Sequence, residues 1–127
     1  MEKVLLIDDT KSYRDKMGGV LRENGLEVVE ASSGEEALEK LAKEGDSFNL
    51  IVSDLHMEKL SGLDLAKIIK KDGITEVPIM MVTTETDDKL REEGVQAGVR
   101  IWLIKPVGDQ KFLKTVQMLL KASKKKG

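Results

Sequence analysis

Two adjacent carboxylates follow the first apolar run of the sequence. In the stretch KVLLIDD, the apolar residues Val4 to Ile7 lead directly to Asp8 and Asp9. Two like charges at the end of a buried strand add nothing to stability, so the pair indicates a function. Other apolar runs also end in polar residues: Asp54 in LIVSD, Thr83 in IMMVT and Lys105 in WLIKP.

These polar residues could carry out phosphoryl chemistry if they met at one rim, because ligands of open parallel sheets bind at the carboxyl ends of strands. Three clustered carboxylates require a cation, and oxygen ligands suit Mg²⁺. Magnesium typically takes one or two protein carboxylates, which leaves one free to act as a nucleophile and form an acyl phosphate. Lys105 would neutralise charge on the transferring group, and the Thr83 hydroxyl would donate a hydrogen bond to its oxygens.

Each of these residues depends on a strand that ends at the rim, and the sequence predicts five strands. The apolar runs are Lys3–Ile7, Glu27–Glu30, Leu50–Ser53, Pro78–Val82 and Ile101–Ile104. Three runs are continuously apolar, which is typical of parallel strands covered on both faces. The runs alternate with segments of helical period, so we expect an α/β fold with right-handed crossovers and helices on both faces of the sheet. Periodicity alone leaves the strand order open.

Apolar residues recur at helical spacing between the runs. The first set is Tyr13, Met17, Val20 and Leu21, and the last is Phe112, Val116, Leu119 and Leu120. Ser33 with Glu36 predicts a capping box for the second helix, and Ser61 predicts a cap for the third. Gly25 and Gly73 mark the expected ends of the first and third helices.

The fourth helical segment, ETDDKLREEGVQAG, is weakly apolar. It offers Leu90, Val95 and Ala97 to the core and contains two glycines, each of which costs roughly 1 kcal/mol in a helix interior. We therefore expect this helix to be prone to movement. Gly18 and Gly19 carry a similar cost in the first helix, where close packing is the expected reason.

Composition excludes several classes of function. The 127 residues fit one domain, and the absence of cysteine removes disulfides, thiolate zinc sites and cysteine nucleophiles. The sole histidine, His56, is too few for a multi-histidine metal site. A net charge of −2 argues against nucleic-acid binding. No apolar run reaches membrane-spanning length and no signal peptide is evident, so we expect a cytoplasmic protein without membrane insertion.

Four motifs in order resemble the receiver domain of two-component response regulators, most closely the single-domain chemotaxis regulators of the CheY type. They are LLIDD, IVSDLHM followed by Gly62, VPIMMVTTE and QAGVRIWLIKP. The resemblance covers essentially the whole chain. It implies a flavodoxin-like (CheY-like) fold, in which five parallel strands have the order 2-1-3-4-5 and five helices cover both faces.

The resemblance also assigns roles to individual residues. It implies that Asp54 accepts a phosphoryl group from a sensor histidine kinase, that Lys105 contacts the phosphate and that Thr83 is the switch hydroxyl. The implied Mg²⁺ ligands are Asp8, Asp9, Asp54 and the backbone carbonyl of His56. Trp102 stands at the switch aromatic position, and His56 and Glu85 stand at the two positions that tune phosphoryl lifetime.

Three residues depart from the family pattern. Glu58 stands where proline is usual, which predicts a more mobile or more acidic loop. Thr84 replaces the common alanine or glycine, and its bulk predicts restricted access of water or a phosphatase to Asp54. Trp102 replaces the usual tyrosine or phenylalanine and lacks a hydroxyl.

These inferences predict a stand-alone switch with a receiver domain at residues 1–122, a basic tail at 123–127 and no output domain. Phosphate on Asp54 would draw Thr83 inward, Trp102 would turn in, and the fourth helix would repack. The face made by the fourth helix, fifth strand and fifth helix would then bind a target, with the flagellar motor switch or a phosphatase as candidates. The chain would catalyse only its own phosphorylation and dephosphorylation, so we expect no turnover enzyme.

Other readings stay open at this stage. An aspartate-nucleophile phosphatase usually carries Asp-x-Asp after the first strand, whereas the aspartates here are adjacent. A pseudo-receiver would serve as an interaction module without phosphorylation. Within the family, the chain could also be a phosphorelay intermediate or a phosphate sink.

Overall fold

Strands and helices alternate along the chain in the computed structural model, which describes residues 1–125. The strands are β1 (Lys3–Ile7), β2 (Glu27–Ala31), β3 (Leu50–Ser53), β4 (Ile79–Thr83) and β5 (Val99–Ile104). The α-helices are α1 (Lys11–Glu23), α2 (Gly34–Glu44), α3 (Gly62–Asp72), α4 (Asp88–Gln96) and α5 (Asp109–Lys125), and a short 3-10 helix, η1 (Gly45–Ser47), follows α2. None of the helices in this range is both long and apolar enough to cross a membrane.

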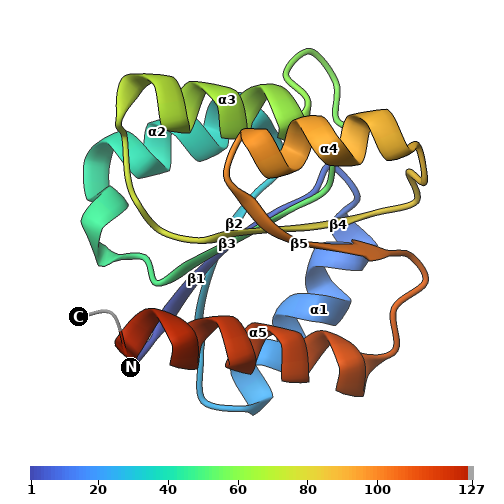
Figure 1. The fold of residues 1–127 in the computed structure, drawn as a ribbon. Coiled ribbons are helices and arrows are strands. Elements are labelled where there is room, and N and C mark those ends of the chain that lie inside the picture. Colours follow the sequence, from blue (N-terminus) through green and yellow to red (C-terminus); the bar gives the residue numbers. More distant parts are fainter. Residues whose placement is uncertain (126–127) are drawn as a thin grey trace.

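The strands form one parallel sheet in the order β2-β1-β3-β4-β5. Helices α1 and α5 cover one face, and α2, α3 and α4 cover the other (Figure 1). The expected fold and strand order are therefore confirmed. Because β1 and β3 lie in the middle, their carboxyl ends are adjacent, and β4 and β5 follow on one side. This order places the ends of β1, β3, β4 and β5 at a single rim.

The continuous apolar runs arise because successive residues of a strand face opposite sides of the sheet. In β1, Leu5 and Ile7 belong to the core under α2, α3 and α4, whereas Val4 and Leu6 belong to the core under α1 and α5. The predicted core positions of α5 are all buried, among them Phe112 at 0% exposure. Two hydrophobic layers thus fix the sheet and the ends of its strands.

Side-chain caps start the second and third helices as predicted. The Ser33 hydroxyl accepts a hydrogen bond from the Glu36 amide, and the Ser61 hydroxyl accepts one from the Asp64 amide, both at 3.0 Å. The return bond of the capping box differs from the standard pattern, because the Glu36 carboxylate accepts from the Ser32 amide at 2.6 Å. Gly73 ends α3 in the left-handed conformation, with φ of 62°.

The predictions about the burial of Val95 and about the end of the last helix are wrong, and the prediction about the packing of Gly18 and Gly19 is partly wrong. Val95 was assigned to the core, but it lies on the outer side of α4 and is 69% exposed. The basic tail was expected to follow the last helix, but α5 continues to Lys125, and residues 126–127 lie outside the described range. Close packing accounts for Gly18, which is buried beside Leu6, whereas a Cβ on Gly19 would meet no atom within 4 Å.

Candidate functional site

The ends of β1, β3 and β5 bring three predicted site residues to one rim. The amides of Asp8, Asp54 and Lys105 donate to carbonyl oxygens of neighbouring strands at 3.1, 3.0 and 2.8 Å, respectively. The backbone ladder therefore continues one residue past each strand. This continuation fixes the three Cα positions and directs the side chains to the same edge of the sheet.

The Lys105 ammonium lies between two of the carboxylates. Its Nζ donates to Oδ2 of Asp8 at 2.9 Å and to Oδ2 of Asp54 at 3.0 Å. The exposed fractions of the side chains are 16% for Lys105, 2% for Asp8 and 11% for Asp54. Burial disfavours the ammonium, but the hydrogen bonds and charges of both carboxylates outweigh burial and raise the pKa of Lys105 above its ordinary value. Lys105 is therefore a fixed cation at the rim.

Backbone groups and an arginine hold the two carboxylate-bearing segments in place. The Thr10 amide donates to Oδ1 of Asp8 at 2.9 Å, and the His56 amide donates to Oδ1 of Asp54 at 3.2 Å. Arg14 donates from Nη1 to the Asp8 carbonyl oxygen at 2.6 Å. The sequence analysis did not single out Arg14. Its signal is a basic residue in the first turns of the helix that directly follows the acidic pair.

Asp9 is exposed and is not part of this bridged group. Across residues 1–125, no set of three or more acidic or histidine side chains forms a preassembled metal cluster. The donor set nevertheless fits Mg²⁺, because it contains only oxygen and because Asp8 and Asp54 already converge on one cation, the Lys105 ammonium. The side chain of Asp9 lies next in sequence and is accessible from solvent.

A close approach of α3 shapes the backbone at Asp54. A Cβ added to Gly62 would lie 2.1 Å from the carbonyl oxygen of Asp54, so any larger residue there would displace the backbone. The Gly62 amide donates to the Leu55 carbonyl at 2.8 Å. In the intervening loop the side chain of Glu58 is exposed. The start of α3 thus packs tightly against the backbone of Asp54 and Leu55.

The loop after β4 gathers the residues predicted to tune and to switch. Thr83 is fully buried, and its Oγ1 accepts from the Glu85 amide at 3.3 Å. Oε1 of Glu85 lies 3.0 Å from Nε2 of His56, and the Glu85 carbonyl accepts from Nε1 of Trp102 at 3.0 Å. Within the described chain, no hydrogen bond joins the Thr83 hydroxyl to Asp54. Glu85 therefore connects the loop after β3 to β5.

Trp102 packs beneath α4, where Gly94 makes room for it. Trp102 is half-buried, and a Cβ on the buried Gly94 would lie 3.1 Å from Cζ3 of the indole. Trp102 therefore packs closely against the backbone of α4. The tight fit of indole against helix backbone was invisible in the sequence, which showed Gly94 only as an unfavourable helix residue.

Thr84 is exposed at the rim, and a further aromatic residue contacts the site from α1. The Lys105 ammonium lies 3.9 Å from the centroid of the Tyr13 ring. The sequence analysis placed Tyr13 only on the apolar face of the first helix.

Comparison with known proteins identifies the family to which the chain belongs. The family model for the response regulator receiver domain matches residues 4–117. The chain is 33% identical over 120 residues to the chemotaxis protein CheY1 of Helicobacter pylori, covering 93% of this chain and 96% of that protein. It is also 33% identical to the transcriptional regulatory protein CpxR homolog of Haemophilus influenzae, covering 97% of this chain and 52% of that protein. The chain thus spans about half the length of the CpxR-type relative.

A solved structure with the same fold is the CheY-like receiver domain protein of Methanospirillum hungatei. It superposes with a TM-score of 0.93 at 25% sequence identity and covers 100% of this chain and 99% of that one. Receiver domains of this family accept phosphoryl groups from histidine kinases. The matched family model, the full-length similarity and the bridged aspartate–lysine rim agree, and the chain belongs to the response regulator receiver domain family.

Proposed function

We propose that this chain is a phosphorylation-dependent switch in which Asp54 takes a phosphoryl group from a histidine kinase and thereby changes the binding of a partner protein. The observation that carries this proposal is the Lys105 ammonium between Asp8 and Asp54. A cation fixed beside a nucleophilic carboxylate is placed to neutralise the charge of an incoming phosphoryl group. The chain modifies itself in this reaction and is not a turnover enzyme.

In the transfer, a carboxylate oxygen of Asp54 attacks the phosphorus of a phosphohistidine. The new P–O bond forms as the P–N bond breaks, and the released imidazole keeps the electron pair. Asp8, Asp9, Asp54 and the His56 carbonyl would hold Mg²⁺, which supplies charge neutralisation when bound. Lys105 can keep its bond to Asp8 while it turns from the Asp54 carboxylate to a phosphoryl oxygen.

The bonds around Glu85 support a route from Asp54 to α4. A phosphoryl oxygen near Thr83 would accept a hydrogen bond from the Thr83 hydroxyl and draw the hydroxyl away from the Glu85 amide, from which its oxygen now accepts at 3.3 Å. A change at Glu85 alters the acceptor that holds the Trp102 indole at 3.0 Å. The indole in turn packs against Gly94. Phosphorylation therefore shifts the population between two packings of α4, because the two packings differ in these contacts.

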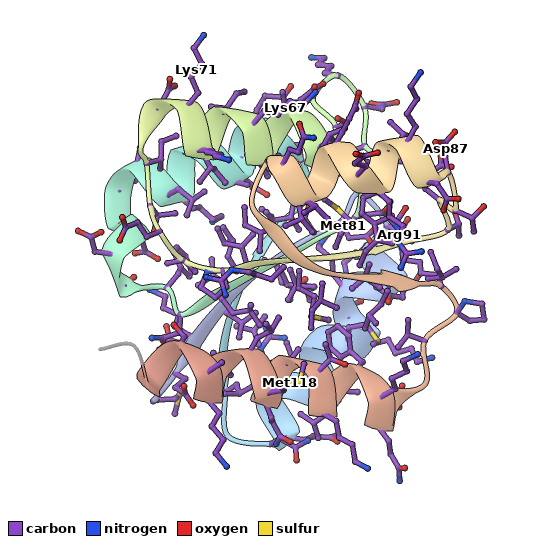
Figure 2. The ribbon with its side chains drawn as sticks, in the orientation of Figure 1. Lys67, Lys71, Met81, Asp87, Arg91 and Met118 are labelled. Carbon is purple, nitrogen blue, oxygen red and sulfur yellow. The ribbon has the colours of Figure 1, made fainter. Side chains whose placement is uncertain are left out.

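The face formed by α4, β5 and α5 has the properties of a partner site. Large hydrophobic side chains are exposed on each of its elements: Val95 at 69%, Ile104 at 37% and Met118 at 54%. A cavity of about 390 Å³ between α4 and β5 is lined in part by Arg91 and Trp102. Arg91 on α4 and Met118 on α5 lie on opposite sides of β5 (Figure 2). Strand β5 is the sheet edge, so this surface is unpaired within the described chain.

We further propose an output in chemotaxis, with a motor component or a phosphatase as the partner. The support is the end-to-end similarity to a chemotaxis protein. The equal identity to a transcriptional regulator leaves the output to be tested by experiment.

The test is the mass of the intact protein after incubation with acetyl phosphate and Mg²⁺, with Asp54→Asn as the matched control. The fluorescence of Trp102, the sole tryptophan, is recorded in parallel. We expect one phosphoryl group on the wild type, dependent on Mg²⁺ and absent from the variant, together with a change in fluorescence. An adduct that persists in Asp54→Asn would mean another acceptor. Absence of both an adduct and beryllium fluoride binding would favour an interaction module that is never phosphorylated.

A further inference from the structure

The Lys105 ammonium has a third neighbour besides its two carboxylates. Its Nζ lies 3.9 Å from the centroid of the Tyr13 ring, well inside the range of a cation–π contact. Tyr13 lies in the first turns of α1, directly after the acidic pair. The ammonium is thus enclosed by Asp8, by Asp54 and by the face of an aromatic ring.

The ring, and not the hydroxyl, makes this contact. Among the described residues, the buried Tyr13 hydroxyl finds no hydrogen-bond partner. Burial also raises the pKa of the Tyr13 phenol above its ordinary value, although the Lys105 charge opposes this, so the phenol stays neutral near pH 7. The aromatic face is therefore the only part of Tyr13 that serves the site.

A contact with a ring face suits a lysine that must change partners. A third fixed acceptor in place of the ring would occupy the N–H bond of Lys105 that remains beside those to Asp8 and Asp54, and would hinder the turn of the ammonium from Asp54 to a phosphoryl oxygen. The attraction to a ring face depends little on where the N–H bonds point, so the ammonium can turn while the contact persists. The half-buried ring also keeps water from one side of the cation.

We propose that Tyr13 is a positioning residue that holds the Lys105 ammonium at the phosphoacceptor through its ring face. This inference rests on the proposed phosphorylation of Asp54. The competing interpretation is that Tyr13 only fills space, because it also packs against the core under α1 and α5. A leucine would fill that space without providing a ring.

The test compares Tyr13→Phe, which keeps the ring, with Tyr13→Leu, which removes it. Phe48→Leu is the control, because the Phe48 ring lies 4.8 Å from the ammonium of Lys3, far from the rim. The first readout is the NMR signal of the Lys105 side-chain methylene protons, which a ring face shifts upfield. We expect this shift in the wild type, in Tyr13→Phe and in Phe48→Leu, and its loss in Tyr13→Leu.

The second readout is the initial rate of phosphorylation by limiting acetyl phosphate, measured where urea titration shows every variant to be folded. We expect Tyr13→Leu to react about 3- to 30-fold more slowly than Tyr13→Phe, the ratio that corresponds to a cation–π contribution of about 0.7 to 2 kcal/mol. Phe48→Leu should match the wild type.

Either of two results would overturn the inference: an unchanged Lys105 signal in Tyr13→Leu, or equal rates for the two Tyr13 variants. A wild type that takes no phosphoryl group would instead refute the proposed function. In that case the NMR comparison still decides whether the Tyr13 ring lies against Lys105 in solution.

Discussion

Replacement of Gly94 by alanine tests whether the Trp102 indole is locked against α4. A Cβ at this position would lie 3.1 Å from Cζ3 and 3.3 Å from Cε3 of the ring. The ring cannot move aside without weakening the hydrogen bond from Nε1 to the Glu85 carbonyl, now 3.0 Å long. The substitution therefore improves helix propensity but creates a steric conflict with the hydrogen-bonded Trp102 side chain.

The free-energy contributions of helix propensity and of overpacking differ in size, so the sign of the change in the free energy of unfolding can be predicted. Alanine is about 1 kcal/mol better than glycine in a helix. Overpacking costs about 1 to 3 kcal/mol, and a weakened hydrogen bond adds up to about 1 kcal/mol. We expect Gly94→Ala to lower the free energy of unfolding by about 1 kcal/mol, and to shift the Trp102 fluorescence because the indole must move.

Gly19→Ala is the matched control. Gly19 lies inside α1, and a Cβ there would meet nothing within 4 Å, so alanine should raise the free energy of unfolding by about 1 kcal/mol. Urea denaturation followed by far-UV circular dichroism measures both variants. In a Trp102→Leu background, which removes the obstructing ring, Gly94→Ala should become stabilising. If Gly94→Ala stabilises the wild type as much as Gly19→Ala does, the ring is not locked and the reasoning fails.

Three further substitutions test the framework of the site. Gly62→Ala should destabilise by several kcal/mol in urea titration, because its Cβ would fall 2.1 Å from the Asp54 carbonyl oxygen; a loss below about 1 kcal/mol would contradict the rigid contact. Ser61→Ala should lower the free energy of unfolding by about 1 kcal/mol through loss of its cap, with Ser61→Thr retaining most of it. A hydrogen bond from Lys3 lowers the pKa of Glu44, so its contribution is present above about pH 4.5 and is lost as pH falls below that value. Glu44→Gln should remove this part of the pH dependence of the free energy of unfolding. Identical pH profiles of stability for the wild type and the variant would refute this prediction.

The sequence predicted the sheet well because each strand is covered on both faces. That geometry requires uninterrupted apolar runs, and such runs are visible without a structure. The residues that end the runs were then placed at one rim by a general property of parallel sheets. The caps at Ser33 and Ser61 were equally predictable, since they are local interactions between residues three apart.

Predictions that depended on the direction of a side chain were less successful than those that depended on the position of a strand. Val95 has the spacing of a core residue, yet the axial rotation of α4 turns it outward and places Gly94 against the sheet. With this rotation Gly94 lies against the Trp102 indole, a contact between residues eight apart in sequence on two different elements. Arg14 was missed for a similar reason, because its position after the acidic pair does not show that it reaches the Asp8 carbonyl and the Glu30 carboxylate.

Glu85 shows why the variable positions could not be interpreted one at a time. Its carboxylate faces His56, its amide donates to Thr83 and its carbonyl accepts from Trp102. In the sequence these four residues are two predicted tuning positions, a predicted switch hydroxyl and an aromatic residue that departs from the family pattern. In the structure His56, Thr83 and Trp102 all contact Glu85 in the loop after β4, so a substitution at any of them changes the geometry available to the others. Trp102 in particular lacks a phenolic hydroxyl, but its indole N–H supplies a donor that fixes the ring to that loop. Tryptophan therefore fits at position 102 because Gly94 supplies the space for the indole and the Glu85 carbonyl supplies the acceptor for its N–H.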